Sequence, residues 1–230
     1  MSFVEITKGL LEGFGFTVLL FAVTLVAAIP IGLLVCFCST TKFKPLKYLT
    51  KVFVWIIRGT PLILQILAIS FIPSSVFGIE NKALADIFGT TMANMNFIFV
   101  CIAFIINYAC YFSEIFRGGI ESIPKGQHEA AAVLGMKKAQ TFTLIILPQV
   151  FKRILPPMSN EIITLVKDTS LARVLGVVEI IMAAQSIINS AYVLWPFFYA
   201  GVFYLIFNGL LSLLFNFIEK KMDYYNCLLY

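Results

Sequence analysis

The sequence predicts an all-α integral membrane protein with five transmembrane helices, in a single domain over residues 1–230. Hydrophobic residues make up 60% of the 230 residues, and the mean hydropathy is +0.94, whereas a soluble domain is typically about 45–50% apolar. These residues gather in five blocks, over about residues 14–38, 52–77, 97–116, 154–178 and 192–218. Runs of this length suit helices that cross a hydrocarbon core of about 30 Å, and the lack of strict alternation excludes a β-barrel.

The blocks differ in the polar residues that they carry. The first and fifth contain no charged residue, the fourth contains several, and the second has Arg58-Gly59-Thr60-Pro61 near its start. Pro61 suits a first helical turn, where its missing N–H leaves no hydrogen bond unmade. Ahead of the first block, apolar residues at helical spacing predict a short helix that lies on the outer surface of the membrane. These residues are Phe3, Ile6, Leu10 and Phe14.

The basic residues give the spans an orientation. The first connection contains four lysines and no acid, and the third contains six Lys and Arg against Glu121 and Glu129. Since cytoplasmic loops carry an excess of Lys and Arg, both connections are expected in the cytoplasm. The N-terminus is then outside, and the C-terminus, with Lys220 and Lys221, is cytoplasmic. Basic residues placed between apolar blocks are typical of a membrane protein rather than of a nucleic-acid-binding surface, so no nucleic-acid partner is expected.

The long cytoplasmic connection, over about residues 117–153, contains the most informative motif. It reads Gly-Gln-His-Glu-Ala-Ala-Ala-Val-Leu-Gly over residues 126–135 and Ile-Ile-Leu-Pro over residues 145–148. Good helix formers predict a short helix from Glu129 to Leu134, which Gly135 ends. Its alanines form a narrow face that another protein can approach closely. Pro148 is expected to break the chain before the fourth span.

This motif resembles the EAA loop of the permease subunits of ATP-binding cassette (ABC) importers. Seven residues match at the spacing of that family: Glu129, Ala130, Ala131, Gly135, Ile145, Leu147 and Pro148. Three further motifs resemble the polar amino acid branch, which includes histidine, glutamine, arginine and cystine permeases. They are Arg58-Gly59-Thr60-Pro61-Leu62 with Gln65, then Glu114-Ile115-x-Arg117-Gly118-Gly119-Ile120, then Lys167-Asp168-Thr169-Ser170-Leu171. The resemblance runs over about residues 14–218, although the second external connection, about 73–96, looks longer than usual for the branch.

The resemblance implies the type I ABC importer permease fold in the bacterial plasma (inner) membrane, and import of polar amino acids by alternating access. The implied partners are ABC ATPase subunits, an extracytoplasmic amino-acid-binding protein, and a second copy of this permease or a related permease. The EAA loop would supply the coupling helix, whose ATPase-coupling positions are Glu129, Ala130, Ala131 and Gly135. ATP and magnesium would bind to the ATPase subunits, so no cofactor and no metal are expected in this chain.

Two acids in the fourth block are candidates for contact with substrate. Glu161 and Asp168 are seven positions apart, so on a helix they differ by only about 20° around the axis and lie about 10 Å apart along it. Thr164 lies between them on the same face. Acids inside the membrane usually face a bundle interior or an aqueous cavity, where these would attract an ammonium group or a basic side chain. The alternative is a structural role in local ion pairs, with Lys152, Arg153, Lys167 and Arg173 as candidate partners.

The other candidate substrate contacts are Glu114, Asn107 and Gln65. Asn107, Tyr111 and Glu114 recur at i, i+4 and i+7, which makes a polar stripe on the third span. Glu114 has a structural alternative in an i,i+3 ion pair with Arg117. Gln65, near the start of the second span, has an alternative in an interhelical hydrogen bond.

Other classes of function fit the sequence less well. The chain has no G-x-x-x-x-G-K-[ST] loop, so the energy for transport must come from another subunit or from an ion gradient. An ion-coupled secondary transporter is the main alternative, but no repeated halves are visible. A membrane enzyme is not expected, because the sequence has a single histidine, His128, no metal-ligand cluster and no G-x-S-x-G motif.

Overall fold

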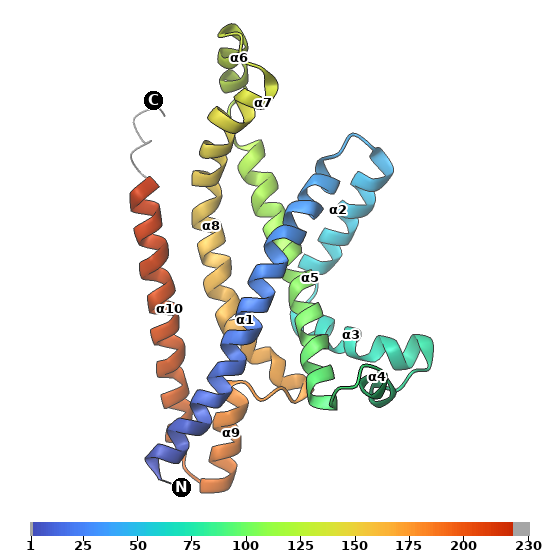
Figure 1. The fold of residues 1–230 in the computed structure, drawn as a ribbon, viewed down its shortest axis with the longest axis vertical. Helices are drawn as coiled ribbons and strands as arrows, with labels where there is room; N and C mark the ends of the chain where they lie inside the picture. Colours follow the sequence, from blue (N-terminus) through green and yellow to red (C-terminus); the bar gives the residue numbers. More distant parts are fainter. Residues whose placement is uncertain (1, 223–230) are drawn as a thin grey trace.

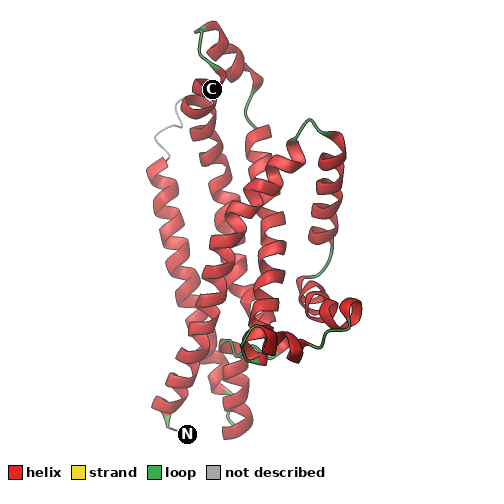
Figure 2. Cartoon of the chain, turned by 45° about the vertical axis from the view of Figure 1, so that its right-hand side comes forward, coloured by secondary structure: helices red, strands yellow, loops and turns green. Residues whose placement is uncertain are grey.

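The computed structural model describes residues 2–222, and the regular structure in that range is all helical (Figure 2). The prediction of an all-α protein is therefore confirmed. The helices in chain order are α1 (Phe3–Thr40), α2 (Lys44–Gly59), α3 (Leu62–Phe77), α4 (Asn81–Ile87), α5 (Met92–Glu121), α6 (Lys125–Val133), α7 (Lys138–Gln140), a π-helix (Thr141–Ile146), α8 (Leu147–Asp168), a 3-10 helix (Thr169–Leu175), α9 (Ile180–Ala191) and α10 (Trp195–Met222).

Helix α5 lies at the centre of the molecule and contacts α1, α2, α3, α4 and α8 (Figure 1). Its large side chains Phe104, Tyr108 and Phe112 are buried in the main core cluster, together with Leu20 of α1 and Leu165 of α8. Burial of such side chains is the main favourable term that fixes the relative positions of these helices. The helix therefore provides the frame on which the polar residues described below are placed.

The five apolar blocks are helical, but only three of them lie in single long helices. Helices α1, α5 and α10 are long and apolar enough to cross a membrane. The second block is divided into α2 and α3, which are bent by 112°, and the fourth continues into α9 with a bend of 54°. At the first bend, Thr60 is extended, with φ −118° and ψ 145°, because the ring of Pro61 disfavours the helical conformation of the residue before it. The sequence motif expected near the start of one span is thus a sharp corner.

The separate helix expected at the N-terminus is part of α1. Ser2 and Glu5 cap the start of α1 by exchanging hydrogen bonds, of 2.7 Å from the Ser2 N–H and 3.3 Å from the Glu5 N–H. The apolar stripe predicted to lie on the membrane surface is instead packed, since Ile6 and Leu10 share a buried cluster with Ile180 of α9. No strong helix breaker separates this stripe from the first block, so one helix continues through both.

The segment between α5 and α8 agrees with the sequence at its turn and differs at its end. Helix α6 ends beside Gly135, whose φ of +70° is a conformation that glycine adopts without strain. This confirms the predicted stop. Pro148 does not break the chain: the π-helix Thr141–Ile146 leads directly into α8, and its wider turn accommodates the missing N–H of Pro148. The fourth long helix therefore begins at Leu147 rather than near residue 154.

The two ends of the molecule carry different elements. The start of α1 lies at one end and α6 at the other, and the last turns of α10 point toward the end that carries α6 (Figure 1). This matches the relative arrangement expected from the loop charges. The assignment of the α6 end to the cytoplasm stays a prediction.

Candidate functional site

The acids of α8 lie on one side of the helix and are half-buried. Asp168, the last residue of α8, accepts a 2.7 Å hydrogen bond on Oδ2 from the hydroxyl of Tyr108 of α5. Glu161 has no hydrogen bond or ion pair with any residue of the range 2–222. Thr164 donates its hydroxyl to the Asn160 carbonyl of the same helix, at 3.0 Å. Among the described residues, Glu161 therefore has no hydrogen bond or ion pair, whereas Tyr108 fixes the position of Asp168.

The local ion pairs considered as an alternative for these acids are not formed in the part of the chain that the structure describes. Asp168 bonds to Tyr108 instead of to Lys167 or Arg173. Arg153 donates to the backbone carbonyl of Ser122, which ties α8 to the end of α5. A role in substrate contact for Glu161, Asp168 and Thr164 stays a prediction.

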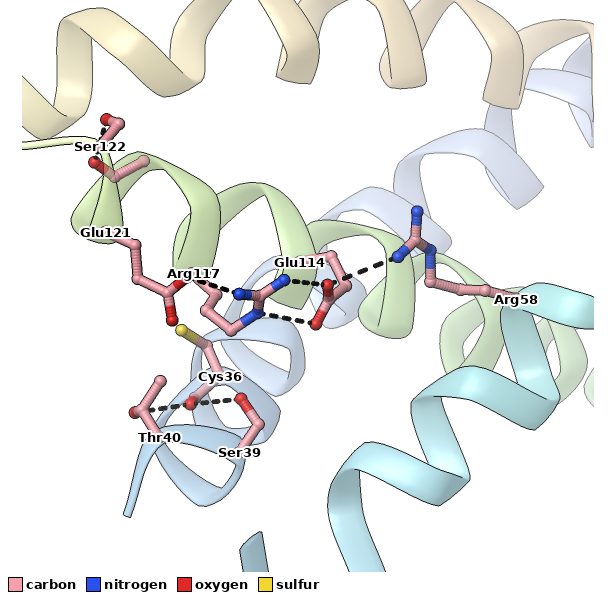
Figure 3. A network of polar contacts seen from close by, with 9 residues as sticks. Cys36, Ser39, Thr40, Arg58, Glu114, Arg117, Glu121 and Ser122 are labelled. Carbon is pink, nitrogen blue, oxygen red and sulfur yellow. Dashed lines mark hydrogen bonds and ion pairs between the residues drawn. The ribbon is translucent and has the colours of Figure 1, made fainter. Parts of the chain in front are cut away.

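Glu114 belongs to a network of charged residues (Figure 3). Arg117 donates to both carboxylate oxygens of Glu114, at 3.1 and 2.5 Å, and to Glu121 at 2.6 Å. Nη1 of Arg58 lies 3.5 Å from the same Glu114 carboxylate. The i,i+3 pair with Arg117 that the sequence left open is therefore formed. Glu114 also lines a groove of about 430 Å³ between α5 and α8, to which Gly118, Gly119 and Arg153 contribute.

Gln65 and Asn107 are bonded to each other. Nδ2 of Asn107 donates to Oε1 of Gln65 at 3.0 Å, and both residues are buried. Nε2 of Gln65 donates to the Ile57 carbonyl at 2.7 Å and lies 3.1 Å from the Thr60 carbonyl. The interhelical hydrogen bond that the sequence left open for Gln65 is therefore formed.

The predicted coupling residues divide between the surface and the interior of the chain. Glu129, Ala130 and Gly135 are exposed, whereas Ala131 is only 1% exposed and packs within the chain. Only part of the expected alanine face is therefore open to a partner. Two large apolar side chains are exposed at the same place, Val133 at 88% and Leu134 at 77%.

Sequence reasoning missed four residues of these sites. Nothing in the sequence pairs Tyr108 with an acid 60 positions away, or places Arg58 against Glu114. For Val133 and Leu134 a signal was present, because adjacent large apolar residues in a charged loop indicate a surface that a partner covers.

The fold and these sites define a membrane subunit of a transport system rather than a soluble protein or an enzyme. Residues 28–224 match the family described as the binding-protein-dependent transport system inner membrane component, and the chain belongs to this family. It is therefore a permease subunit, which works with a binding protein and with a separate ATPase. Membership of this family decides against the ion-coupled transporter and against the membrane enzyme.

Several curated relatives cover almost the whole chain. The L-cystine transport system permease protein TcyB of Bacillus subtilis is 36% identical, over 97% of this chain and 89% of the relative. The arginine transport system permease protein ArtQ of the same organism is 30% identical, over 93% and 92%. The glutamine transport system permease protein GlnP of Escherichia coli is 34% identical, also over 93% and 92%.

A solved structure shares the fold. The crystal structure of an amino acid ABC transporter with histidines superposes with a TM-score of 0.82 at 28% identity, over 95% of this chain and 96% of the other. The type I importer permease fold implied by the EAA loop is therefore supported along nearly the full length of the chain.

Proposed function

We propose that this permease imports polar amino acids and that Glu161 and Asp168 bind the positively charged part of the substrate. The observation that carries the proposal is the state of Glu161, which is half-buried on a membrane helix and has no hydrogen bond or ion pair with any described residue. An acid inside a membrane is costly unless a cation or water compensates it, and such residues commonly mark substrate pathways.

The balance of charge favours a substrate with an extra positive group. Glu114 is paired with Arg117 and Arg58, whereas Glu161 and Asp168 form no ion pair with a described residue, although the charge of Arg58 also acts on Glu161. Lys167 is the next residue to Asp168, and on an ideal helix it points about 100° away, so it need not cancel the charge of the site. Arginine, lysine and histidine are therefore the preferred substrates in this proposal.

The names of the relatives support amino acids as the class of substrate, and they include both cationic and zwitterionic amino acids. Arginine and histidine, which occur in the names of a relative and of the solved structure, are compatible with a site that contains Glu161 and Asp168. Cystine and glutamine, in the names of two other relatives, are zwitterions without an excess cationic side chain. A zwitterion becomes the better ligand if a basic residue moves close to one of the two acids during transport.

Helix α6 is proposed as the coupling helix that docks into the ATPase. Its exposed surface, formed by Glu129, Ala130, Val133 and Leu134, combines a charge with apolar area, as protein interfaces do. Gln149 of α8 donates to Gln127 of α6 at 3.2 Å, so movement of α6 is transmitted to the helix that carries the acids. The permease is proposed to act as a dimer with itself or with a related chain, and the binding protein delivers substrate at the end opposite to α6.

The test is uptake into proteoliposomes that contain the permease, the ATPase and the binding protein, with arginine, lysine, histidine, glutamine and cystine in competition. Glu161→Gln is expected to raise the KM for the preferred cationic substrate by about tenfold, which corresponds to about 1.4 kcal/mol. Glu219→Gln, an acid on α10, serves as the matched control and should leave the KM unchanged. The proposal fails if Glu161→Gln and Asp168→Asn both leave KM, selectivity and rate at wild-type values.

A further inference from the structure

The corner between α2 and α3 is capped by a side chain from within α3. Carbonyl groups in the last turn of a helix have no partner in that helix, and the corner itself contributes no side-chain cap at the start of α3. Nε2 of Gln65 reaches back and donates to the carbonyl of Ile57 at 2.7 Å, and it lies 3.1 Å from that of Thr60. The two helices are thereby joined across their bend of 112°.

The other end of the Gln65 amide is bonded to α5. Oε1 of Gln65 accepts a 3.0 Å hydrogen bond from Nδ2 of Asn107, and the two side chains are only 9% and 5% exposed. A buried amide that loses one hydrogen-bond partner keeps the full cost of its desolvation. Loss of either partner would therefore destabilise this arrangement of the helices. One side chain thus connects three helices.

A second link joins the same corner to α5 closer to its surface. The guanidinium of Arg58 lies 5.1 Å from the ring centroid of Tyr111 and 3.5 Å from the Glu114 carboxylate, as Figure 3 shows for Arg58 and Glu114. The side chain of Arg58 is 41% exposed, and solvent weakens an ion pair at such a position. The polar stripe Asn107, Tyr111 and Glu114 is therefore the face of α5 on which the corner rests.

We propose that Gln65 and Asn107 are positioning residues for transport, which fasten the α2–α3 corner to α5 and do not contact substrate. A helix interrupted by a sharp bend has two parts that are able to move separately, and motions of this type occur at such breaks. The buried amide link makes the corner and α5 move as one body. Asn107 is also next to Tyr108, which bonds Asp168, so the corner and the end of α8 are attached to adjacent residues of α5.

Three substitutions separate the parts of this link. Asn107→Leu removes the bond between helices and leaves the capping of α2 by Gln65. Gln65→Glu keeps an acceptor for Asn107 and removes the Nε2 donor to the carbonyls of Ile57 and Thr60. Asn107→Gln keeps an amide donor and is the conservative rescue. Ser70→Ala and Ser113→Ala are matched controls, because these residues are 3% and 1% exposed and, among the described residues, each hydroxyl bonds within its own helix.

The experiment uses the assembled transporter, with its ATPase and binding protein, in proteoliposomes. Asn107→Leu and Gln65→Glu are expected to lower the maximal uptake rate by about tenfold or more while the substrate KM changes by less than about twofold, the pattern of a residue outside the substrate contacts. ATP consumed per substrate imported should rise, since hydrolysis continues while movement is poorly transmitted. Asn107→Gln should recover a large part of the rate, and both serine controls should match wild type.

Two results would overturn the proposal. A raised KM with an unchanged maximal rate in Asn107→Leu and Gln65→Glu would make these residues substrate contacts. A wild-type rate and wild-type ATP consumption in Asn107→Leu would show that the link has no role in transport. If Asn107→Leu fails to assemble with the ATPase, the substrate KM and the maximal uptake rate of Gln65→Glu decide the question. Asn107→Gln is then the conservative comparison. Selectivity among amino acids is not expected to change, so this test is independent of the role proposed for Glu161.

Discussion

The hydroxyl of Tyr108 donates a 2.7 Å hydrogen bond to Oδ2 of Asp168, which holds the last residue of α8 against the middle of α5. Tyr108 is only 2% exposed, so water does not replace this donor when it is removed. The position of one candidate substrate acid is therefore set by a different helix from the one that carries it. The other acid, Glu161, has no such constraint among the described residues.

Tyr108→Phe is expected to lower both stability and apparent substrate affinity. The substitution leaves the ring in the core but removes a hydrogen bond to a charged group, which is worth about 1.5–3 kcal/mol. The freed carboxylate of Asp168 then takes several orientations, and the KM for uptake should rise several-fold. Thermal unfolding in detergent and uptake in proteoliposomes measure the two effects. Tyr199→Phe, which removes a hydroxyl with no hydrogen bond to the described residues, is the control; equal behaviour of the two variants would contradict the role of Tyr108.

Gly119→Ala is expected to destabilise the contact between α5 and α8. A Cβ added at Gly119 would lie 2.2 Å from Cγ2 of Ile154, and this branched side chain has little rotamer freedom on a helix. Overpacking of this kind costs about 1–3 kcal/mol. The measurement is the midpoint of thermal unfolding of the purified permease.

The neighbouring glycine gives an internal control for that prediction. A Cβ at Gly118 meets no atom within 4 Å, so Gly118→Ala should leave the midpoint unchanged or raise it slightly. Ile154→Leu removes the methyl group that is in the way and should restore part of the stability of Gly119→Ala. Equal midpoints for Gly118→Ala and Gly119→Ala would rule out the close packing.

The class of fold and the turn that ends α6 were predictable because they depend on local chemistry. Long apolar blocks have few alternatives to helices in a membrane, and each block is helical in the structure. The turn at Gly135 was predictable for the same reason, since a glycine after a short run of helix formers commonly adopts the left-handed conformation that ends a helix.

The roles of the polar residues were not predictable, because they depend on contacts between distant parts of the chain. The spacing of Asn107, Tyr111 and Glu114 identified a shared face of α5 but not what covers it. A cavity and another helix both favour polar residues at such positions. The bend of 112° at Thr60 and Pro61 brings Gln65 and Arg58 to this face, and the size of that bend is not encoded by the motif alone.

The orientation in the membrane is predicted from the basic residues and can be tested by labelling. In a background without native cysteines, a cysteine in place of Lys44 should react with a membrane-impermeant maleimide only from the cytoplasmic side. A cysteine in place of Lys82, in the second connection, should react from the outside. The opposite pattern in intact cells and inverted vesicles would reverse the topology.

Leu134→Asp is expected to separate the permease from its ATPase without unfolding it. The side chain of Leu134 is 77% exposed, so a charge there meets water in the free permease, and surface substitutions of this kind usually change stability by no more than about 0.5 kcal/mol. In a complex with the ATPase the same charge would be buried without a partner, which is far more costly.

The measurement is co-purification of the ATPase with the tagged permease, together with the thermal midpoint of the permease alone. We expect Leu134→Asp to lose most of the bound ATPase at an unchanged midpoint, and Leu134→Met, which keeps an apolar side chain of similar size, to retain it. Val133→Asp should behave like Leu134→Asp, because Val133 is 88% exposed beside it. Full retention of the ATPase by both aspartate variants would place the docking surface elsewhere on the chain.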